Sequence, residues 1–346
     1  MIYFLSKLVK WDDLRMAIIN NPSQVEIKNA SQALKDGHLV AFPTETVYGL
    51  GADATNEKAV SRVYSVKGRP TDHPLIVHIS SINQLEKWAV DIPEYAIKLA
   101  EGFWPGPMTL ILKRSNLAKN FITGGQDRVG VRVPAHPVAL ALLSEFEKLG
   151  GSGVVAPSAN IFSAVSPTNA YAVTEEIGGK LSKSDIIIDG GQCLIGIEST
   201  IVDCSEQIAG ILRSGAVTLE MIESLIGLQV NTKPETEIKA PGLFEVHYSP
   251  VAEVQIGLPV RPGEGFLALE NIQSPPGSIR LASPKNLEQY ANELYGALRF
   301  GDEKKLTKIV VIPPEGAGLA TAIRDRLSKS SGKKTCLLYT SDAADE

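Results

Sequence analysis

The sequence predicts an α/β protein: an open, twisted, mixed sheet with helices packed against it, followed by a second, smaller Rossmann-like α/β domain. Short apolar runs of strand length recur along the chain, and stretches with helical three- and four-residue spacing lie between them. Their order is mixed rather than strictly alternating, which favours a mixed sheet. A segment rich in proline and charge, residues 230–250, separates the longer first part from the rest and predicts a linker.

In the first part, the initial predicted strand is "LVAF" at 39–42, and the helix that follows has the clearest boundaries. In "TNEKAVSRVYSVKGRP" the apolar positions share one helical face, Thr55 or Asn56 can cap the start, and Gly68 with Pro70 ends the helix. Further strands are predicted at 74–79, 108–113, 129–133, 153–156, 185–189, 199–204 and 210–213, with helices at about 137–149, 168–178 and 218–227.

Beyond the linker, four apolar runs and one amphipathic helix predict a small domain with a parallel sheet. The strands are expected at 252–258, 265–271, 278–282 and 308–314, and the helix at 286–299. The expected organisation is therefore an N-terminal extension at 1–24, a first domain at 25–229, a linker at 230–250 and a second domain at 251–335.

The last eleven residues, "CLLYTSDAADE" at 336–346, resemble a translated sequencing-library adapter and are left out of the fold prediction. They carry three acidic residues, while the whole chain has a net charge of -5. With or without this tail, the charge is not that of a general nucleic-acid-binding protein, for which a basic chain or face is expected.

Hydropathy and cysteine content indicate the compartment. No apolar run approaches the roughly 20 residues that span a bilayer, and the three cysteines have neither metal-binding nor disulfide-framework spacing. We therefore expect a cytoplasmic protein that does not associate with membranes.

The sequence contains no glycine-rich phosphate loop of either common type, so a bound nucleotide would be held mainly by side chains. Polar residues that could do this stand at the ends of predicted strands and in the turns that follow, positions that converge on one crevice in open α/β sheets. They are Lys67, Arg69, Arg132, Ser158, Asn160, Ser199, Thr200 and Arg213. Arg132 and Arg213 lie inside apolar runs with no acidic partner evident nearby, so we expect a ligand phosphate or carboxylate beside them.

Each of these features also has an ordinary alternative. Lys67 and Arg69 can be solvated cations that complement a helix C-terminus. His73 and His78 can be surface or hydrogen-bonded core residues without any metal. The "PSAN" stretch can be an ordinary turn, and "FPTETVYGLGADA" can be a strand-to-helix turn whose hydroxyls satisfy local backbone.

Taken together and in order, seven motifs resemble the YrdC/Sua5 family of threonylcarbamoyl-AMP synthases. They are "FPTETVYGLGADA", "KGRPTDHPLIVHI", "WPGPMTLIL", "VGVRVPAHP", "APSANIFSAVSPT", "GIESTIVD" and "ILRSGAV", which span about residues 25–228. "APGLFEVHYSP" and the second domain resemble the longer, two-domain Sua5 arrangement.

The resemblance implies a YrdC-like fold with a basic cavity and a nucleotidyltransferase reaction. L-threonine, bicarbonate and ATP with Mg²⁺ give threonylcarbamoyl-AMP and pyrophosphate, and a tRNA threonylcarbamoyl transferase then uses the product for N6-threonylcarbamoyladenosine at tRNA position 37. It implies Thr46, His78, Arg132 and Ser199 at L-threonine, and Lys67, Arg69, His73, Ser158, Asn160, Ser166 and Arg213 at ATP. Lys67 and Arg69 are also the expected catalytic residues.

The implied chemistry assigns both nucleophiles to the substrates, so we expect no covalent protein nucleophile. We also expect no metal ligands from protein side chains and, from the charge and the absence of aromatic stacking motifs, no stable nucleic-acid binding. Because a carbamate is short-lived in water, we expect the linker, including His247 and Tyr248, to close over the site as a lid.

Two alternative functions stay open at this point. One is a carbamoyl-adenylate-forming enzyme with another substrate, and the other is an RNA-binding module that uses the same basic cavity, for which a steep salt dependence would be expected.

Overall fold

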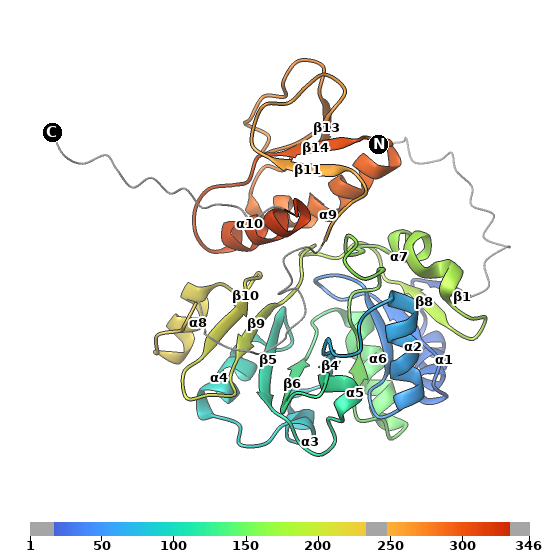
Figure 1. The fold of residues 1–346 in the computed structure, drawn as a ribbon. Coiled ribbons are helices and arrows are strands. Elements are labelled where there is room, and N and C mark those ends of the chain that lie inside the picture. The colour runs from blue at the N-terminus through green and yellow to red at the C-terminus, as the bar shows by residue number, and fades with distance from the viewer. Residues whose placement is uncertain (1–16, 233–247, 333–346) are drawn as a thin grey trace.

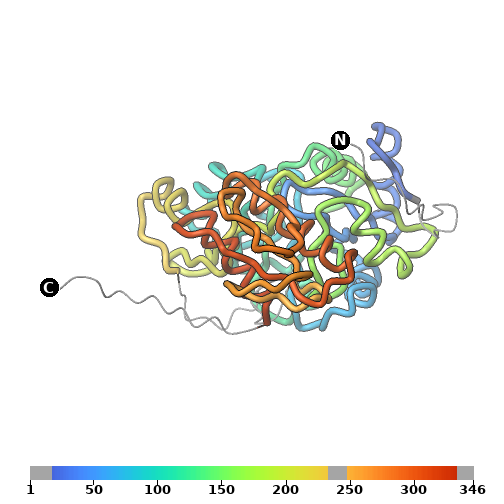
Figure 2. The backbone as a smooth tube through the Cα atoms, turned by 90° about the horizontal axis from the view of Figure 1, so that it is seen from above, coloured from blue at the N-terminus to red at the C-terminus, as the bar shows by residue number. Residues whose placement is uncertain are grey.

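The computed structural model describes residues 17–232 and 248–332, which fold around two sheets (Figure 1). Helices α9 and α10 lie between the smaller sheet and the larger part of the molecule. Seen from above, the C-terminal segment in orange and red lies over the middle of the first part (Figure 2).

The larger sheet is mixed, as predicted, and its described strands have the order β1-β8-β2-β3-β7-β4-β6-β5-β9-β10. They are β1 (Ala17–Asn20), β2 (Val40–Phe42), β3 (Gly49–Asp53), β4 (Ile76–His78), β5 (Met108–Lys113), β6 (Arg128–Arg132), β7 (Val154–Val155), β8 (Ile186–Asp189), β9 (Thr200–Asp203) and β10 (Gly210–Arg213). The pairs β4–β6 and β5–β9 are parallel, whereas β5–β6 and β9–β10 are antiparallel.

Helices pack against this sheet and enclose apolar clusters, one of which contains Trp88 and Tyr48 and another Phe42. They are α1 (Gln24–Lys35), α2 (Glu57–Lys67), α3 (Leu85–Trp88), α4 (Glu94–Phe103), α5 (Asn120–Thr123), α6 (Pro137–Lys148), α7 (Ala170–Ile177) and α8 (Leu219–Ile226), with short 3₁₀ turns at Ile82–Gln84 and Gly178–Lys180. No helix in the described ranges has the length and apolar character needed to cross a membrane.

The smaller sheet has the order β11-β14-β12-β13, and all of its strand pairs are parallel, which confirms the prediction. Its elements are β11 (Glu253–Ile256), β12 (Gly265–Leu267), β13 (Ile279–Ala282), α9 (Leu287–Glu303), β14 (Lys308–Val311) and α10 (Leu319–Ser330). Helix α10 was not predicted, because its N-cap is Gly318, which has no side chain to cap the helix.

Helix α2 has the boundaries that its sequence predicts. The Asn56 side chain accepts a hydrogen bond from the backbone N–H of Ala59, and Gly68 ends the helix in the left-handed conformation at φ 62°. The helix therefore stops at Lys67, and the chain turns at once toward Arg69. Local sequence alone therefore places Lys67 at the last position of the helix and Arg69 just beyond it.

Strand β3 was not predicted, because "GLGAD" contains two glycines and has low β-propensity. It forms because β2 and β7 pair with it on both sides. A methyl group at Gly51 would lie 2.8 Å from both the Val40 carbonyl oxygen and the Phe42 ring. Glycine is needed here for close packing between strands.

We expect Gly51→Ala to lower the free energy of unfolding by about 1–3 kcal/mol, because backbone and ring atoms must move to admit the methyl group. The control is Gly179→Ala, where no atom lies within 4 Å of the added carbon. Chemical denaturation of both variants measures the difference. Equal stability of the two variants would contradict the packing role of Gly51.

Candidate active site

The described residues of the predicted site lie inside the protein rather than on its surface. All are buried except His73 and Ser158, which are partly exposed. The buried ones are Thr46, Lys67, Arg69, His78, Arg132, Asn160, Ser166, Ser199, Arg213 and Tyr248. His247 lies outside the described residues. The alternative of solvated cations at Lys67 and Arg69 is therefore wrong, since these side chains are withdrawn from water.

Arg132 ends β6 and is the centre of the predicted threonine group. Its guanidinium donates to the Thr46 hydroxyl at 3.1 Å and to the Gly106 carbonyl at 3.2 Å, and it forms an ion pair with Glu45. Glu45 also accepts from the backbone N–H of Ala135 at 2.9 Å.

We expected no acidic partner for Arg132, and its ion pair with Glu45 shows that this expectation is wrong. Glu45 is 87 positions away along the chain, and the connection between β2 and β3 brings it to the end of β6. Neither residue's local sequence indicates the contact. A ligand is therefore not required to balance the charge of Arg132.

His78 lies opposite Arg132 in the pairing of β4 with β6. Burial and the neighbouring Arg132 charge lower the pKa of His78 to about 3, so the imidazole is neutral near pH 7. Its Nδ1 is 3.3 Å from the Ile76 carbonyl oxygen, and its ring meets the edge of Phe42. The site thus holds a neutral imidazole beside a cation.

Lys67 reaches from the end of α2 into the loop after β7. Its ammonium group donates to the carbonyl oxygens of Ser158 and Asn160, each at 2.6 Å, and the residue is 1% exposed. Burial, with Arg69 as a second cause, lowers the pKa of Lys67 well below its usual value. The "KGR" and "SAN" motifs therefore meet through Lys67.

Arg69 lies in the same neighbourhood and is likewise held by carbonyl oxygens. It donates to the carbonyls of His73 at 3.3 Å and Pro74 at 3.0 Å, and its guanidinium lies 5.8 Å from the Phe162 ring centre. Burial lowers the pKa of Arg69 to about 10. Within the described residues, neither Lys67 nor Arg69 forms an ion pair.

Arg213 ends β10 and links the predicted ATP and threonine groups. It donates to the carbonyl oxygen of Ser199 at 3.0 Å and to its hydroxyl at 3.2 Å. The Ser199 hydroxyl is also 2.9 Å from that of Thr109 on β5. Burial lowers the pKa of Arg213, as it does for Lys67 and Arg69.

One buried carboxylate of this region, Glu198, is not among the predicted site residues. Glu198 lies in the quoted "GIESTIVD" motif, and it accepts hydrogen bonds from the predicted residue Ser166 and from Tyr295 and Arg326 of the second domain. A charged residue at the end of an apolar run was the available signal. Its contacts with Tyr295 and Arg326 could not be predicted, because these residues lie 97 and 128 positions away along the chain.

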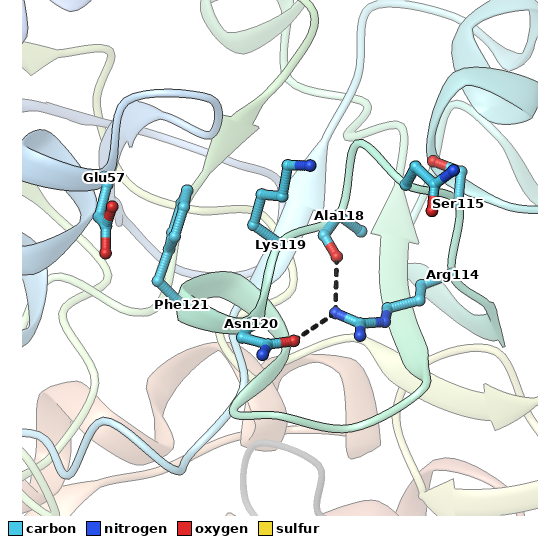
Figure 3. Close-up of a pocket in the computed structure, with 8 residues that line it drawn as sticks. Glu57, Arg114, Ser115, Ala118, Lys119, Asn120 and Phe121 are labelled. Carbon is cyan, nitrogen blue, oxygen red and sulfur yellow. Dashed lines mark hydrogen bonds between the residues drawn. The ribbon is translucent and has the colours of Figure 1, made fainter.

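A separate cavity of about 520 Å³ contains none of the predicted residues (Figure 3). Its labelled lining residues are Glu57, Arg114, Ser115, Ala118, Lys119, Asn120 and Phe121. Arg114 donates to Ala118 and Asn120 beside it, so its guanidinium is already engaged locally. Across the described ranges, no group of three His, Cys, Asp or Glu side chains is placed to hold a metal ion.

We expect Glu45→Ala to lower the free energy of unfolding by about 3–5 kcal/mol, because it leaves the Arg132 charge buried beside neutral groups. The control is Glu94→Ala, which removes the exposed Glu94–Lys98 pair and should change stability little. Urea denaturation compares the two. Similar losses would contradict a buried, mutually dependent Glu45–Arg132 pair.

We also expect an acid-side stability effect from His78. Between pH 6.5 and about 3 the unfolded chain binds a proton that the folded imidazole does not, so stability falls as the pH is lowered. The slope due to this residue is at most ~1.4 kcal/mol per pH unit. His78→Gln should flatten the pH dependence of the free energy of unfolding in this window. An unchanged slope would show that His78 is protonated in the folded protein.

Both parts of the chain match known protein families. Residues 32–215 match the family described as "Telomere recombination", named Sua5_yciO_yrdC, and residues 217–332 match "Threonylcarbamoyl-AMP synthase, C-terminal domain". The threonylcarbamoyl-AMP synthase of Pyrococcus abyssi is 41% identical, with 91% of this chain and 97% of that protein covered. The Bacillus subtilis protein of the same name is 38% identical, with 89% and 93% covered.

A solved structure has the same fold. The crystal structure of P. abyssi Sua5 complexed with L-threonine matches with a TM-score of 0.81 and 39% identity, and it covers 92% of this chain and 97% of that one. Both domains are included in this match. The chain belongs to the Sua5/YciO/YrdC family, in its two-domain form with the C-terminal domain of threonylcarbamoyl-AMP synthases.

Proposed function

We propose that this chain is an L-threonylcarbamoyladenylate synthase that joins L-threonine, bicarbonate and ATP to give threonylcarbamoyl-AMP and pyrophosphate. The product would supply N6-threonylcarbamoyladenosine at tRNA position 37 through a separate tRNA threonylcarbamoyl transferase. The names of its relatives support this activity.

The single observation that carries the proposal is the burial of Lys67 and Arg69 against neutral carbonyl oxygens. Two neighbouring cations withdrawn from water without an ion pair in the described residues favour an anionic ligand. Arg213 is a third buried cation close to Arg69. Burial is the main cause of the lowered pKa of Arg69, and the charge of Arg213 lowers it further. A triphosphate would supply the negative charge that this region lacks. The exclusion of water would strengthen each contact between a cation and the triphosphate.

The Arg132 group suits an amino acid as the second substrate. A zwitterion has a carboxylate that can accept from Arg132 and an ammonium group that can donate to Glu45. Neutral His78 adds no further positive charge beside that ammonium group. The hydroxyls of Thr46 and Ser199 could contact the remaining polar groups of L-threonine.

The reaction then needs alignment rather than a protein nucleophile. The deprotonated threonine amine attacks bicarbonate, water is lost, and a carbamate forms. A carbamate oxygen attacks the α-phosphorus of ATP, and the bond to the β-phosphate oxygen breaks to release pyrophosphate. Lys67 and Arg69 would stabilise the charge that develops on the departing pyrophosphate, and Mg²⁺ would enter as part of the ATP substrate.

The test is pyrophosphate release from ATP and Mg²⁺ by protein ending at Thr335, with L-threonine and bicarbonate each present or omitted. We expect release only when both are present, and a loss of ~100-fold or more in Lys67→Ala and Arg69→Ala. Lys98→Ala, at an exposed position of α4, is the control that should keep activity. Release that ignores threonine, or no release alongside tight, salt-sensitive RNA binding, would overturn the proposal.

A further inference from the structure

A buried carboxylate connects the second domain to the predicted nucleotide site. Glu198 precedes Ser199, and its two oxygens accept from different parts of the chain. One oxygen accepts from the Ser166 hydroxyl at 2.6 Å. The other accepts from the Tyr295 hydroxyl of α9 at 2.9 Å and from the Arg326 guanidinium of α10 at 2.8 Å.

Glu198 is ionised in the folded protein. Burial alone would raise its pKa, but the charges of Arg326 and Arg213 and the hydrogen bonds from Ser166 and Arg326 hold it at about 2. Arg326 is itself fully buried, and it also pairs with Asp325 at 2.6 Å. The Glu198–Arg326 ion pair is therefore held in place, since both side chains are buried and each has further polar partners.

This state determines what Ser166 can offer to a ligand. An ionised carboxylate only accepts hydrogen bonds, so the single hydroxyl hydrogen of Ser166 is directed to Glu198. The oxygen of Ser166 then has only lone pairs left, which suit a donor group. Phosphate oxygens are acceptors, whereas the ribose hydroxyls and the adenine amino group of ATP are donors.

The second domain also holds the backbone on both sides of this connection. Arg299 of α9 donates to the carbonyl of Val165, next to Ser166, and pairs with Glu176 at 3.0 Å. Asn292 of the same helix donates to the carbonyls of Cys193 at 2.7 Å and Leu194 at 2.9 Å. Residues 165–166 and 193–198 are therefore positioned by α9 and α10 together.

We propose that Tyr295 and Arg326 are positioning residues of the nucleotide site: by holding Glu198 they fix Ser166 as a hydrogen-bond acceptor for a donor on the nucleoside part of ATP. This inference rests on the proposed function and deepens it. It assigns the second domain a direct part in nucleotide recognition, since its helices determine how Ser166 faces the ligand.

The test measures ATP affinity of the full chain by calorimetry without threonine, in a double-mutant cycle. The variants are Arg326→Lys, Tyr295→Phe and Ser166→Ala, alone and in pairs with Ser166→Ala. Tyr290→Phe is the matched control, because Tyr290 lies on the same helix, is equally buried and donates to Ile312 within its own domain. Arg324→Lys is the control on α10, since Arg324 donates to carbonyls of Pro314 and Gly316.

We expect Arg326→Lys and Tyr295→Phe to weaken ATP binding about fivefold to tenfold, the effect of losing one neutral hydrogen bond, that between Ser166 and the nucleoside. In the Ser166→Ala background the same changes should weaken it less than twofold, because their effect acts through Ser166. In turnover, the KM for ATP should rise while kcat stays within twofold. The two controls should bind ATP as the wild type does.

Additive losses, or unchanged affinity in Arg326→Lys and Tyr295→Phe, would overturn the inference while leaving the proposed function intact. A wild-type chain that binds no ATP would overturn both. Three analogues identify the donor: 2′-deoxy-ATP, 3′-deoxy-ATP and purine riboside triphosphate, which lacks the amino group. The analogue without the relevant donor should show no penalty from Arg326→Lys. A penalty of the same size with all three would overturn the acceptor role of Ser166.

Discussion

The burial of positive charge is the constraint on which the rest of this structure depends. A charged group that leaves water must find compensating groups. Lys67 and Arg69 find backbone carbonyl oxygens, which are neutral dipoles and leave the net charge in place. The loop after β7 must therefore follow one path, so that the carbonyls of Ser158 and Asn160 both face Lys67. The Asn160 amide helps to maintain that path through the carbonyls of Ile161 and Ala164.

Two other buried cations have carboxylate partners, and this contrast separates residues available for a ligand from residues that support the fold. Arg132 is matched by Glu45, and Arg326 is matched by Glu198. A matched pair can remain buried without a ligand, but removal of either partner leaves an uncompensated charge. The Lys67–Arg69 region has no such carboxylate within the described residues. An anionic substrate would provide there what a protein carboxylate provides in the other two places.

The second domain contacts the first through polar groups at Glu198, and it also packs against the end of the linker at Tyr248. Tyr295 stacks on Tyr248 with ring centres 5.6 Å apart, and Arg326 lies over the same Tyr248 ring at 5.4 Å. Tyr248, expected as part of a lid, is thus buried against α9 and α10. The second domain can in this way influence residues near the middle of the chain, because Glu198 accepts hydrogen bonds from Tyr295 and Arg326 of that domain and from Ser166 of the first domain.

Local sequence determined the elements whose signals are complete within a few residues. Strands β5 and β10 match their predicted ranges, and α2 has its predicted cap and end, because apolar runs, caps and a left-handed glycine act over short distances. The order of the motifs likewise indicated the family. Strand β3 was missed, since its pairing with β2 and β7 outweighs the low strand propensity of its glycines.

Only the tertiary structure decided how the site's charges are paired. The family resemblance named Arg132 and Ser166, but it did not indicate that Glu45 would balance the first or that Glu198 would take the hydrogen of the second. Such contacts join residues far apart in the chain, and their strength depends on burial, which no single segment determines. By itself, the sequence determined which polar side chains are available and where the short elements begin and end. The fold determined which of those charges are already neutralised and which remain for a substrate.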